Sequence, residues 1–138
     1  MAVKNDKFTI LTKGFDDVVE ITSKIQDIVS FSNIDEGVAN IFVASSTASI
    51  LTLEYEPGLV LDLPKVLEML VPINKIYKHD NMWQDGNAFS HLKTCLIGNN
   101  VTLPIIDGKI KLGNYQQIIL IDFDNKPSNK EIIVSVVY

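Results

Sequence analysis

VTLPIIDGKIKL, residues 101–112, contains the clearest structural signal in the chain. Val101-Thr102-Leu103 alternates strictly between apolar and polar residues, as a strand with one buried face does. Asp107 and Gly108 follow between two apolar segments, and Asp-Gly in that setting is typical of the two-residue turn of a β-hairpin. Because a tight hairpin joins antiparallel strands, this stretch predicts an antiparallel sheet in the C-terminal part of the chain.

Further strands are predicted on both sides of this hairpin. Upstream, the apolar patterns predict strands over 7–12, 18–21, 38–44 and 49–55, and downstream over 109–112, 115–123 and 131–137. With the helices described next, the element order is ββα-ββα-ββββ. This order lacks a βαβ alternation, so it predicts an α+β fold with two mostly antiparallel sheets, packed like a sandwich, and about three helices.

The first and third helices have recognisable ends. Ser23-Lys24-Ile25-Gln26 fits a capping box, which predicts a helix start there, and residues 33–37 end that helix. The third helix is predicted over 88–97, with Asn87 as its N-cap and Gly98 directly after its last turn.

The second helix follows a turn at Glu56-Pro57-Gly58. Proline is tolerated in the first turn of a helix but breaks a helix interior. The regular part is therefore expected to begin near Asp62, which places Pro64 in the first turn. Residues 77–86, between the second and third helices, are polar and are expected to be irregular.

Composition predicts a single cytoplasmic domain, 1–138. The length of 138 residues and the hydrophobic share of 46% suit one well-filled domain. No apolar run approaches the roughly 20 residues that a membrane-spanning helix needs, and no signal-peptide pattern opens the chain. Cys95 is the only cysteine, which excludes an internal disulfide and suits a reducing compartment. Cys95 itself is expected to be a buried, inert thiol.

The charge distribution argues against two classes of partner. The net charge is −5, and the 12 basic residues are all lysines, scattered singly along the chain. An acidic chain without clustered bases is repelled by phosphate backbones and by anionic lipid head groups. Nucleic acid and membrane surfaces are therefore not expected as partners.

The candidate chemistry lies in one polar segment. The familiar P-loop, Rossmann, HExxH, CxxC and GxSxG motifs are all absent from the sequence. Both histidines of the chain, His79 and His91, lie within residues 77–91. Imidazole is a common ligand of divalent metals and a general acid or base near neutral pH, although two histidines in a chain of this length is also ordinary usage.

Three ordered blocks of sequence resemble motifs of the YjbQ-like family, whose members are often labelled secondary thiamine-phosphate synthase. Residues 42–58, with FVASSTA and EYEPG, resemble its H-T-T-A…N-E-x-E-P-G block. Residues 77–93, with YKH and DGNAFSHLK, resemble Y-x-H…D-G-N-A-x-x-H-h-K. Residues 112–116, LGNYQ, resemble L-G-T-W-Q. Together these blocks cover about half of the chain.

The resemblance implies a two-sheet fold, a homotrimer and a pocket lined by three histidines that binds a metal or a phosphorylated ligand. The corresponding positions here are Ser45, His79 and His91. Serine is a poor zinc ligand, and catalytic zinc usually has three protein ligands. A divalent metal such as zinc would be held by His79 and His91, with Glu54 or Asp85 as a possible third ligand.

The resulting candidate site has two groups of residues. The candidate catalytic residues are His79, His91 and Glu54, and the candidate ligand-binding residues are Ser45, Ser46, Thr47, Asp85, Asn87 and Gln116. The hydroxyls of residues 45–47 could bind a phosphate or could only form a tight turn. Lys78 and Lys93 are the nearby cations. Asp122 and Asp124 are interpreted as solvated surface, and Trp83 as a ligand-stacking residue or a subunit contact.

Three functions are compatible with this pattern. The first is a divergent YjbQ-like protein with weak thiamine-phosphate synthase activity, a transferase that joins a pyrimidine diphosphate to a thiazole phosphate with loss of pyrophosphate. The second is a non-catalytic trimeric module that binds a small phosphorylated ligand or a metal. The third is a structural protein with a vestigial site.

Overall fold

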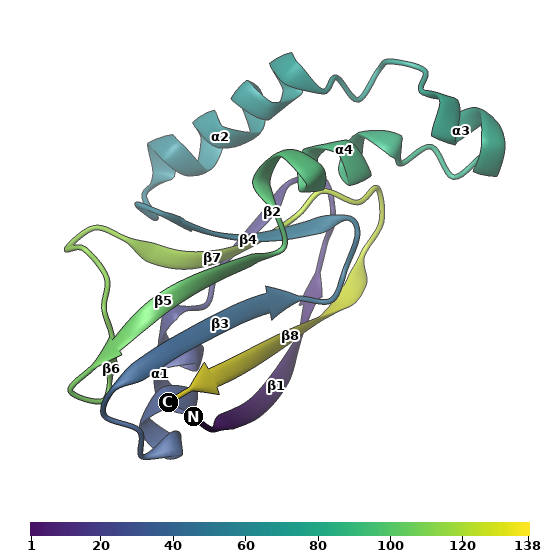
Figure 1. Cartoon of the computed structure of the whole chain (residues 1–138). Coiled ribbons are helices and arrows are strands. Elements are labelled where there is room, and N and C mark those ends of the chain that lie inside the picture. Colours follow the sequence, from purple (N-terminus) through teal and green to yellow (C-terminus); the bar gives the residue numbers. More distant parts are fainter.

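The computed structural model describes all residues 1–138 and contains two antiparallel sheets and four helices (Figure 1). The five-stranded sheet has the order β1 (Val3–Thr12), β8 (Ser128–Val137), β3 (Gly37–Val43), β5 (Asn100–Ile106), β6 (Lys109–Ile110). The three-stranded sheet has the order β2 (Asp17–Glu20), β7 (Gln117–Asp122), β4 (Ala48–Leu53). The predicted α+β class with two antiparallel sheets is confirmed.

The predicted hairpin joins β5 to β6. Ile106 pairs with Lys109, and Asp107 and Gly108 between them both have positive φ, at 50° and 70°. Two consecutive positive φ values are what the type I′ turn of a two-residue hairpin requires, and glycine adopts them at no steric cost.

The molecule has three layers. The main core lies between the two sheets and is completed by α1 (Thr22–Ser32), which contributes Ile25 and Val29. In β7, Ile118 and Leu120 face this core, while Ile121 faces a second, smaller core, as the period of two in a strand requires. The second core lies under α2 (Pro57–Leu70), so that α2 and α4 (Ala88–Ile97) form the third layer in Figure 1. None of the four helices combines the length and apolarity needed to span a membrane.

The predicted capping box of the first helix is wrong. Helix α1 starts at Thr22, and its N-cap residue Ile21 makes no side-chain capping bond. The Gln26 amide is used elsewhere: its Nε2 donates to the carbonyl of Gly108 at 3.1 Å, and its Oε1 accepts from the backbone N–H of Ile110 at 3.0 Å. Gln26 therefore ties α1 to the β5–β6 hairpin instead of closing the helix end.

Helix α2 begins earlier than predicted, at Pro57. The side chain of Glu56 accepts hydrogen bonds from the backbone N–H groups of Gly58 and Leu59, and Pro57 occupies the first helical turn, where its missing N–H costs nothing. With its N-terminus stabilised in this way, the helix continues past Pro64, which lies in its interior.

A fourth, unpredicted helix lies in the segment expected to be irregular. Helix α3 (Lys78–Trp83) has only six residues, too few for an apolar period to be visible in the sequence. Asp80 holds it against α4: its Oδ2 accepts from the backbone N–H of Tyr77 at 3.3 Å, and its Oδ1 accepts from that of Ala88 at 3.0 Å.

Candidate functional site

Helices α3 and α4 bring the two histidines together. His79 lies on α3 and His91 on α4, and their ring centroids are 4.7 Å apart with an edge-on angle of 61°. Both rings line a cleft of about 360 Å³, together with Tyr77, Lys78, Ala88 and Leu92. The two histidines that the sequence proposed as a pair therefore share one cleft.

Two oxygen atoms hold the His79 ring. Its Nε2 lies 3.2 Å from Oδ1 of Asn87 and 3.3 Å from Oδ1 of Asp85. The structure therefore brings Asp85 and Asn87, both proposed as ligand-binding residues, into contact with His79. Asn87 precedes α4 as predicted, but its side chain makes no capping bond and instead supports the imidazole.

Asn87 connects His79 to the protein interior. Its Nδ2 donates to Oδ1 of Asp124 at 3.3 Å, and the hydroxyl of Thr47 donates to the other carboxylate oxygen of Asp124 at 3.2 Å. Asn87, Asp124 and Thr47 are all buried. The turn between β3 and β4 is thereby joined to the histidine cleft.

A buried lysine completes this polar network. Lys130 Nζ donates to Ser45 Oγ at 3.2 Å and to Thr47 Oγ1 at 3.0 Å, and it lies 3.5 Å from Asp122 Oδ1. Thr12 donates to the other oxygen of Asp122 at 2.6 Å. A lysine with 6% exposure needs such partners, because an unpaired buried charge is strongly unfavourable. The Ser45 and Thr47 hydroxyls are occupied within the protein, while Ser46 is exposed.

Hydrogen bonding keeps Asp124 ionised. Burial alone would raise the pKa of its carboxyl group, but the hydrogen bonds from the backbone N–H of Asn125 and from the side chain of Asn87 outweigh burial. The Thr47 hydroxyl and the positive charge of Lys130 act in the same direction. The pKa of Asp124 is therefore lowered, and Asp124 is a carboxylate at neutral pH.

The interpretation of Asp122 and Asp124 as solvated surface was wrong. Both are buried, with 0% and 7% exposure, and both belong to the network that supports His79. The available signal was the apolar run Ile118–Ile121, which is typical of a strand buried on both faces. Residues that continue such a strand are expected to be buried as well.

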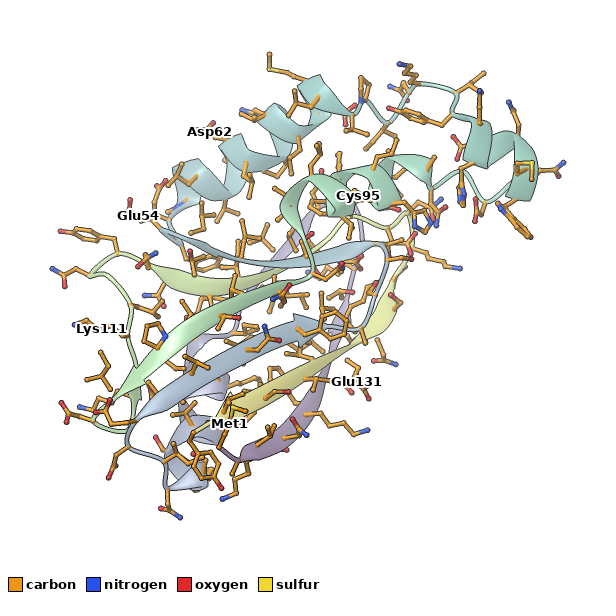
Figure 2. The ribbon with its side chains drawn as sticks, viewed as in Figure 1. Met1, Glu54, Asp62, Cys95, Lys111 and Glu131 are labelled. Carbon is orange, nitrogen blue, oxygen red and sulfur yellow. The ribbon has the colours of Figure 1, made fainter.

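Two proposed site residues lie elsewhere. Glu54 is exposed and follows the end of β4 that is remote from the β3–β4 turn, as Figure 2 shows. Gln116 is at the same end: its Nε2 approaches Thr52 Oγ1 at 3.5 Å, and its Oε1 accepts from the backbone N–H of Gly113 at 2.7 Å. Within one chain, neither residue joins the histidine pair.

Lys93 is also removed from the cleft. It has 0% exposure, and its Nζ lies 3.4 Å from Asp16 Oδ1 and 3.3 Å from Glu68 Oε2. Burial raises the pKa of Asp16, and the nearby charge of Lys93 offsets that effect only in part. Lys93 therefore links α4 to α2 and to the β1–β2 turn instead of serving the cleft as a cation.

Cys95 was predicted to be buried, but it is exposed. It lines an apolar groove of about 370 Å³ between the end of α2 and α4, together with Leu70, Val71, Lys75, Tyr77, Leu92 and Leu96. The groove and the histidine cleft adjoin, because Tyr77 and Leu92 line both.

The residues of one chain do not fit a catalytic zinc site. No group of three His, Cys, Asp or Glu side chains is arranged to hold a metal ion. Ser45 Oγ interacts with Lys130, and Asp85 is engaged by His79 Nε2. Two imidazoles remain, one fewer protein ligand than catalytic zinc usually has.

These features define an α+β protein of two antiparallel sheets with a paired-histidine cleft, and comparison with known proteins identifies its family. The model of the family described as "UPF0047 protein YjbQ-like" matches residues 6–138. A UPF0047 protein of Methanothermobacter thermautotrophicus is 35% identical over 136 residues, which cover 99% of this chain and 93% of the relative. One of Archaeoglobus fulgidus is 34% identical over 128 residues, covering 93% and 97%.

A solved structure gives the same result. The fold matches that of a YbjQ-like protein of unknown function from Sulfolobus solfataricus, with a TM-score of 0.87 and 31% identity over 98% of each chain. The chain therefore belongs to the UPF0047 YjbQ-like family, and the resemblance seen in the sequence is confirmed.

Proposed function

We propose that the cleft between α3 and α4 binds a small phosphorylated molecule, and that His79 and His91 exchange protons or hydrogen bonds with it. The observation that carries this proposal is the imidazole pair, 4.7 Å between ring centroids, in a cleft that also contains Lys78. A pair of imidazoles beside a lysine supplies both acid–base groups and positive charge.

Lys78 is the one lysine that lines the cleft. The carboxylate of Asp80 is occupied by two backbone N–H groups, and that of Asp85 faces His79. Lys78 forms no ion pair with any carboxylate of the chain. The backbone N–H of Ala88, the first residue of α4, is donated to Asp80 Oδ1, so Lys78 and the two imidazoles are the groups of the cleft that can attract an anion.

Secondary thiamine-phosphate synthesis is the first reaction to assay in this cleft. In that reaction a thiazole nitrogen displaces pyrophosphate from the methylene carbon of a pyrimidine diphosphate, and the departing pyrophosphate needs positive charge or a proton. Lys78 and the two imidazoles are the groups that can supply these. Activity is expected to be weak, because Lys93 is buried and Ser45 replaces the family's third histidine.

Calorimetric titration with inorganic pyrophosphate tests the binding proposal. Loss of one charge-assisted hydrogen bond costs about 1.5 kcal/mol or more, so Lys78→Ala and His91→Ala are each expected to weaken binding about tenfold or more. Lys111→Ala is the matched control, because Lys111 is exposed and lies at the other end of the molecule (Figure 2). The proposal would be refuted if Lys78→Ala and His91→Ala bound pyrophosphate as tightly as Lys111→Ala does, or if the wild type showed no saturable binding.

The catalytic part has a separate test. Formation of thiamine phosphate from the two precursors should fall strongly in both His79→Ala and His91→Ala. A rate that is unchanged in both variants would exclude this cleft as the catalytic site. Binding of pyrophosphate without any product would leave a non-catalytic binding module, which is the second function that the sequence suggests.

We also propose that the protein assembles into a homotrimer through its third layer, formed by α2 and α4 and called the helical layer below. The family resemblance implies the trimer, and the exposed apolar side chains of α2 and α4 supply a surface for it: Leu61, Val66, Met69, Leu70, Leu92 and Leu96. Contiguous exposed apolar patches on a folded protein commonly mark interfaces.

A further inference from the structure

The hydrogen bonds of the buried network run in a defined direction. The ammonium of Lys130 can only donate, so Thr47 Oγ1 accepts from it at 3.0 Å. The single hydroxyl proton of Thr47 is then directed to Oδ2 of Asp124 at 3.2 Å. Asp124, held as a carboxylate, can only accept, and it is therefore the point at which donors converge.

Asp124 thereby sets the orientation of the Asn87 amide. A carboxylate oxygen 3.3 Å away requires the NH₂ group of Asn87 on that side. The carbonyl oxygen of the same amide must then face His79, where it lies 3.2 Å from Nε2. The reverse orientation would place two acceptors against each other in a buried site, which costs about 1–3 kcal/mol.

His79 Nε2 is consequently surrounded by acceptors. The Asn87 carbonyl and the carboxylate of Asp85, 3.3 Å away, can only accept, so Nε2 must carry the hydrogen. In a neutral imidazole only one ring nitrogen is protonated. The lone pair of His79 is then on Nδ1.

We infer that Asp85 and Asn87, the latter oriented by Asp124, are positioning residues that hold neutral His79 in the Nε2–H tautomer, and that Nδ1 is the nitrogen offered to a bound ligand. The statement that Nδ1 faces a ligand rests on the proposed function, whereas the tautomer is a property of the protein without a ligand. His91 has no hydrogen-bond partner on either ring nitrogen, so the two histidines differ: His79 is fixed and His91 can adjust.

Nuclear magnetic resonance of the imidazole nitrogens tests the inference without any ligand. The ¹⁵N signals of a protonated and a bare ring nitrogen are well separated, and the two histidines are assigned with a His91→Gln variant. In the wild type at alkaline pH, His79 is expected to show a protonated Nε2 and a bare Nδ1. A protonated Nδ1 would overturn the inference.

Two variants test the positioning residues. Asp85→Ala combined with Asn87→Ala removes both acceptors, and Asp85→Ala combined with Asp124→Ala removes one acceptor and frees the Asn87 amide, so in each the two His79 signals should move toward each other as tautomers mix. Lys111→Ala is the control variant, because Lys111 is exposed and remote from the cleft, and both His79 signals should stay as in the wild type. An unchanged His79 pattern in both variants would overturn the role of Asn87 and Asp124. Should Asp124→Ala fail to fold, Asp124→Ser takes its place.

The two proposals can fail separately. The predicted tautomer in a protein that binds no inorganic pyrophosphate would refute the proposed function and leave the positioning role intact. Pyrophosphate binding with His79 in the Nδ1–H tautomer would refute the positioning role alone.

Discussion

Asp122, Asp124 and Lys130 place three charged groups in the interior, where each must be compensated. Asp122 accepts from Thr12 and pairs with Lys130, and Asp124 accepts from side chains of the β3–β4 turn and of the residue before α4. Breaking such a buried network by removing one partner costs more than the network itself contributes, because the remaining charges lose their partners. These residues therefore connect the stability of the fold to the geometry of the cleft.

The pKa of Asp124 leads to a prediction about acid stability. Its folded-state pKa is below the ordinary value of 3.8, so its stabilising effect is present above that value and is lost as the pH falls through the folded pKa. Asp124→Asn is expected to lower the free energy of unfolding by about 2 kcal/mol at neutral pH. The difference from wild type should shrink as the pH falls below about 4. Urea unfolding at a series of pH values measures it.

A difference that stays constant into strong acid would show that the carboxylate charge of Asp124 does not contribute. Asp17→Asn is a suitable control, because Asp17 is only partly buried and the same network does not contain it. Its effect should be smaller throughout.

At the scale of elements, helix α2 depends on its N-terminal cap. Leu67 is its only buried residue, so packing holds it weakly along most of its length, and Pro64 interrupts its internal hydrogen bonds. Glu56 compensates at the start by accepting two backbone N–H groups. The ion pair between Glu68 and Lys93 holds the later part.

Loss of the cap should loosen α2. Glu56→Ala is expected to destabilise the protein by about 1 kcal/mol, the usual cost of removing a capping side chain, as measured by chemical denaturation. Glu54→Ala is the matched control: Glu54 is exposed and makes no side-chain hydrogen bond, so its change should stay within about 0.5 kcal/mol. Equal effects of the two substitutions would contradict the capping role.

The elements that the sequence predicted correctly are those defined by neighbouring residues. The β5–β6 hairpin follows from Asp107-Gly108, and the end of α4 from Gly98, because turn and cap chemistry is local. Helix α3 was missed because its six residues form fewer than two turns, which is too short for an apolar period to be visible. Gln26 was misassigned because its true partners, Gly108 and Ile110, are more than 80 residues away.

The candidate site divides in the same way. His79 and His91 could be paired from the sequence because both lie in one short segment that folds back on itself. The contact of Asp124 with Thr47 joins residues 77 positions apart, which no local pattern encodes. Glu54 was grouped with the histidines through the family resemblance alone, whereas it follows β4 at the end remote from the β3–β4 turn.

For the molecule as a whole, the helical layer is incompletely covered. The two sheets share a closed core, but the outer surface of α2 and α4 exposes apolar side chains and the groove lined by Cys95. Trp83 on α3, near the same layer, is 71% exposed. Its role as a subunit contact stays a prediction. Because the groove adjoins the histidine cleft, assembly there would shield the cleft from solvent.

A charge placed in the groove should therefore prevent assembly. Wild-type protein is expected to have about three times the monomer mass of 15.4 kDa by light scattering. Leu96→Asp, which buries a carboxylate in any contact made through the groove, should reduce that mass to the monomer value. Phe31→Asp is the matched control, because Phe31 is 81% exposed on α1, outside the helical layer, and should leave the mass unchanged. A trimer that survives Leu96→Asp but not Phe31→Asp would place the interface on the opposite side, and the histidine cleft would then remain open to solvent.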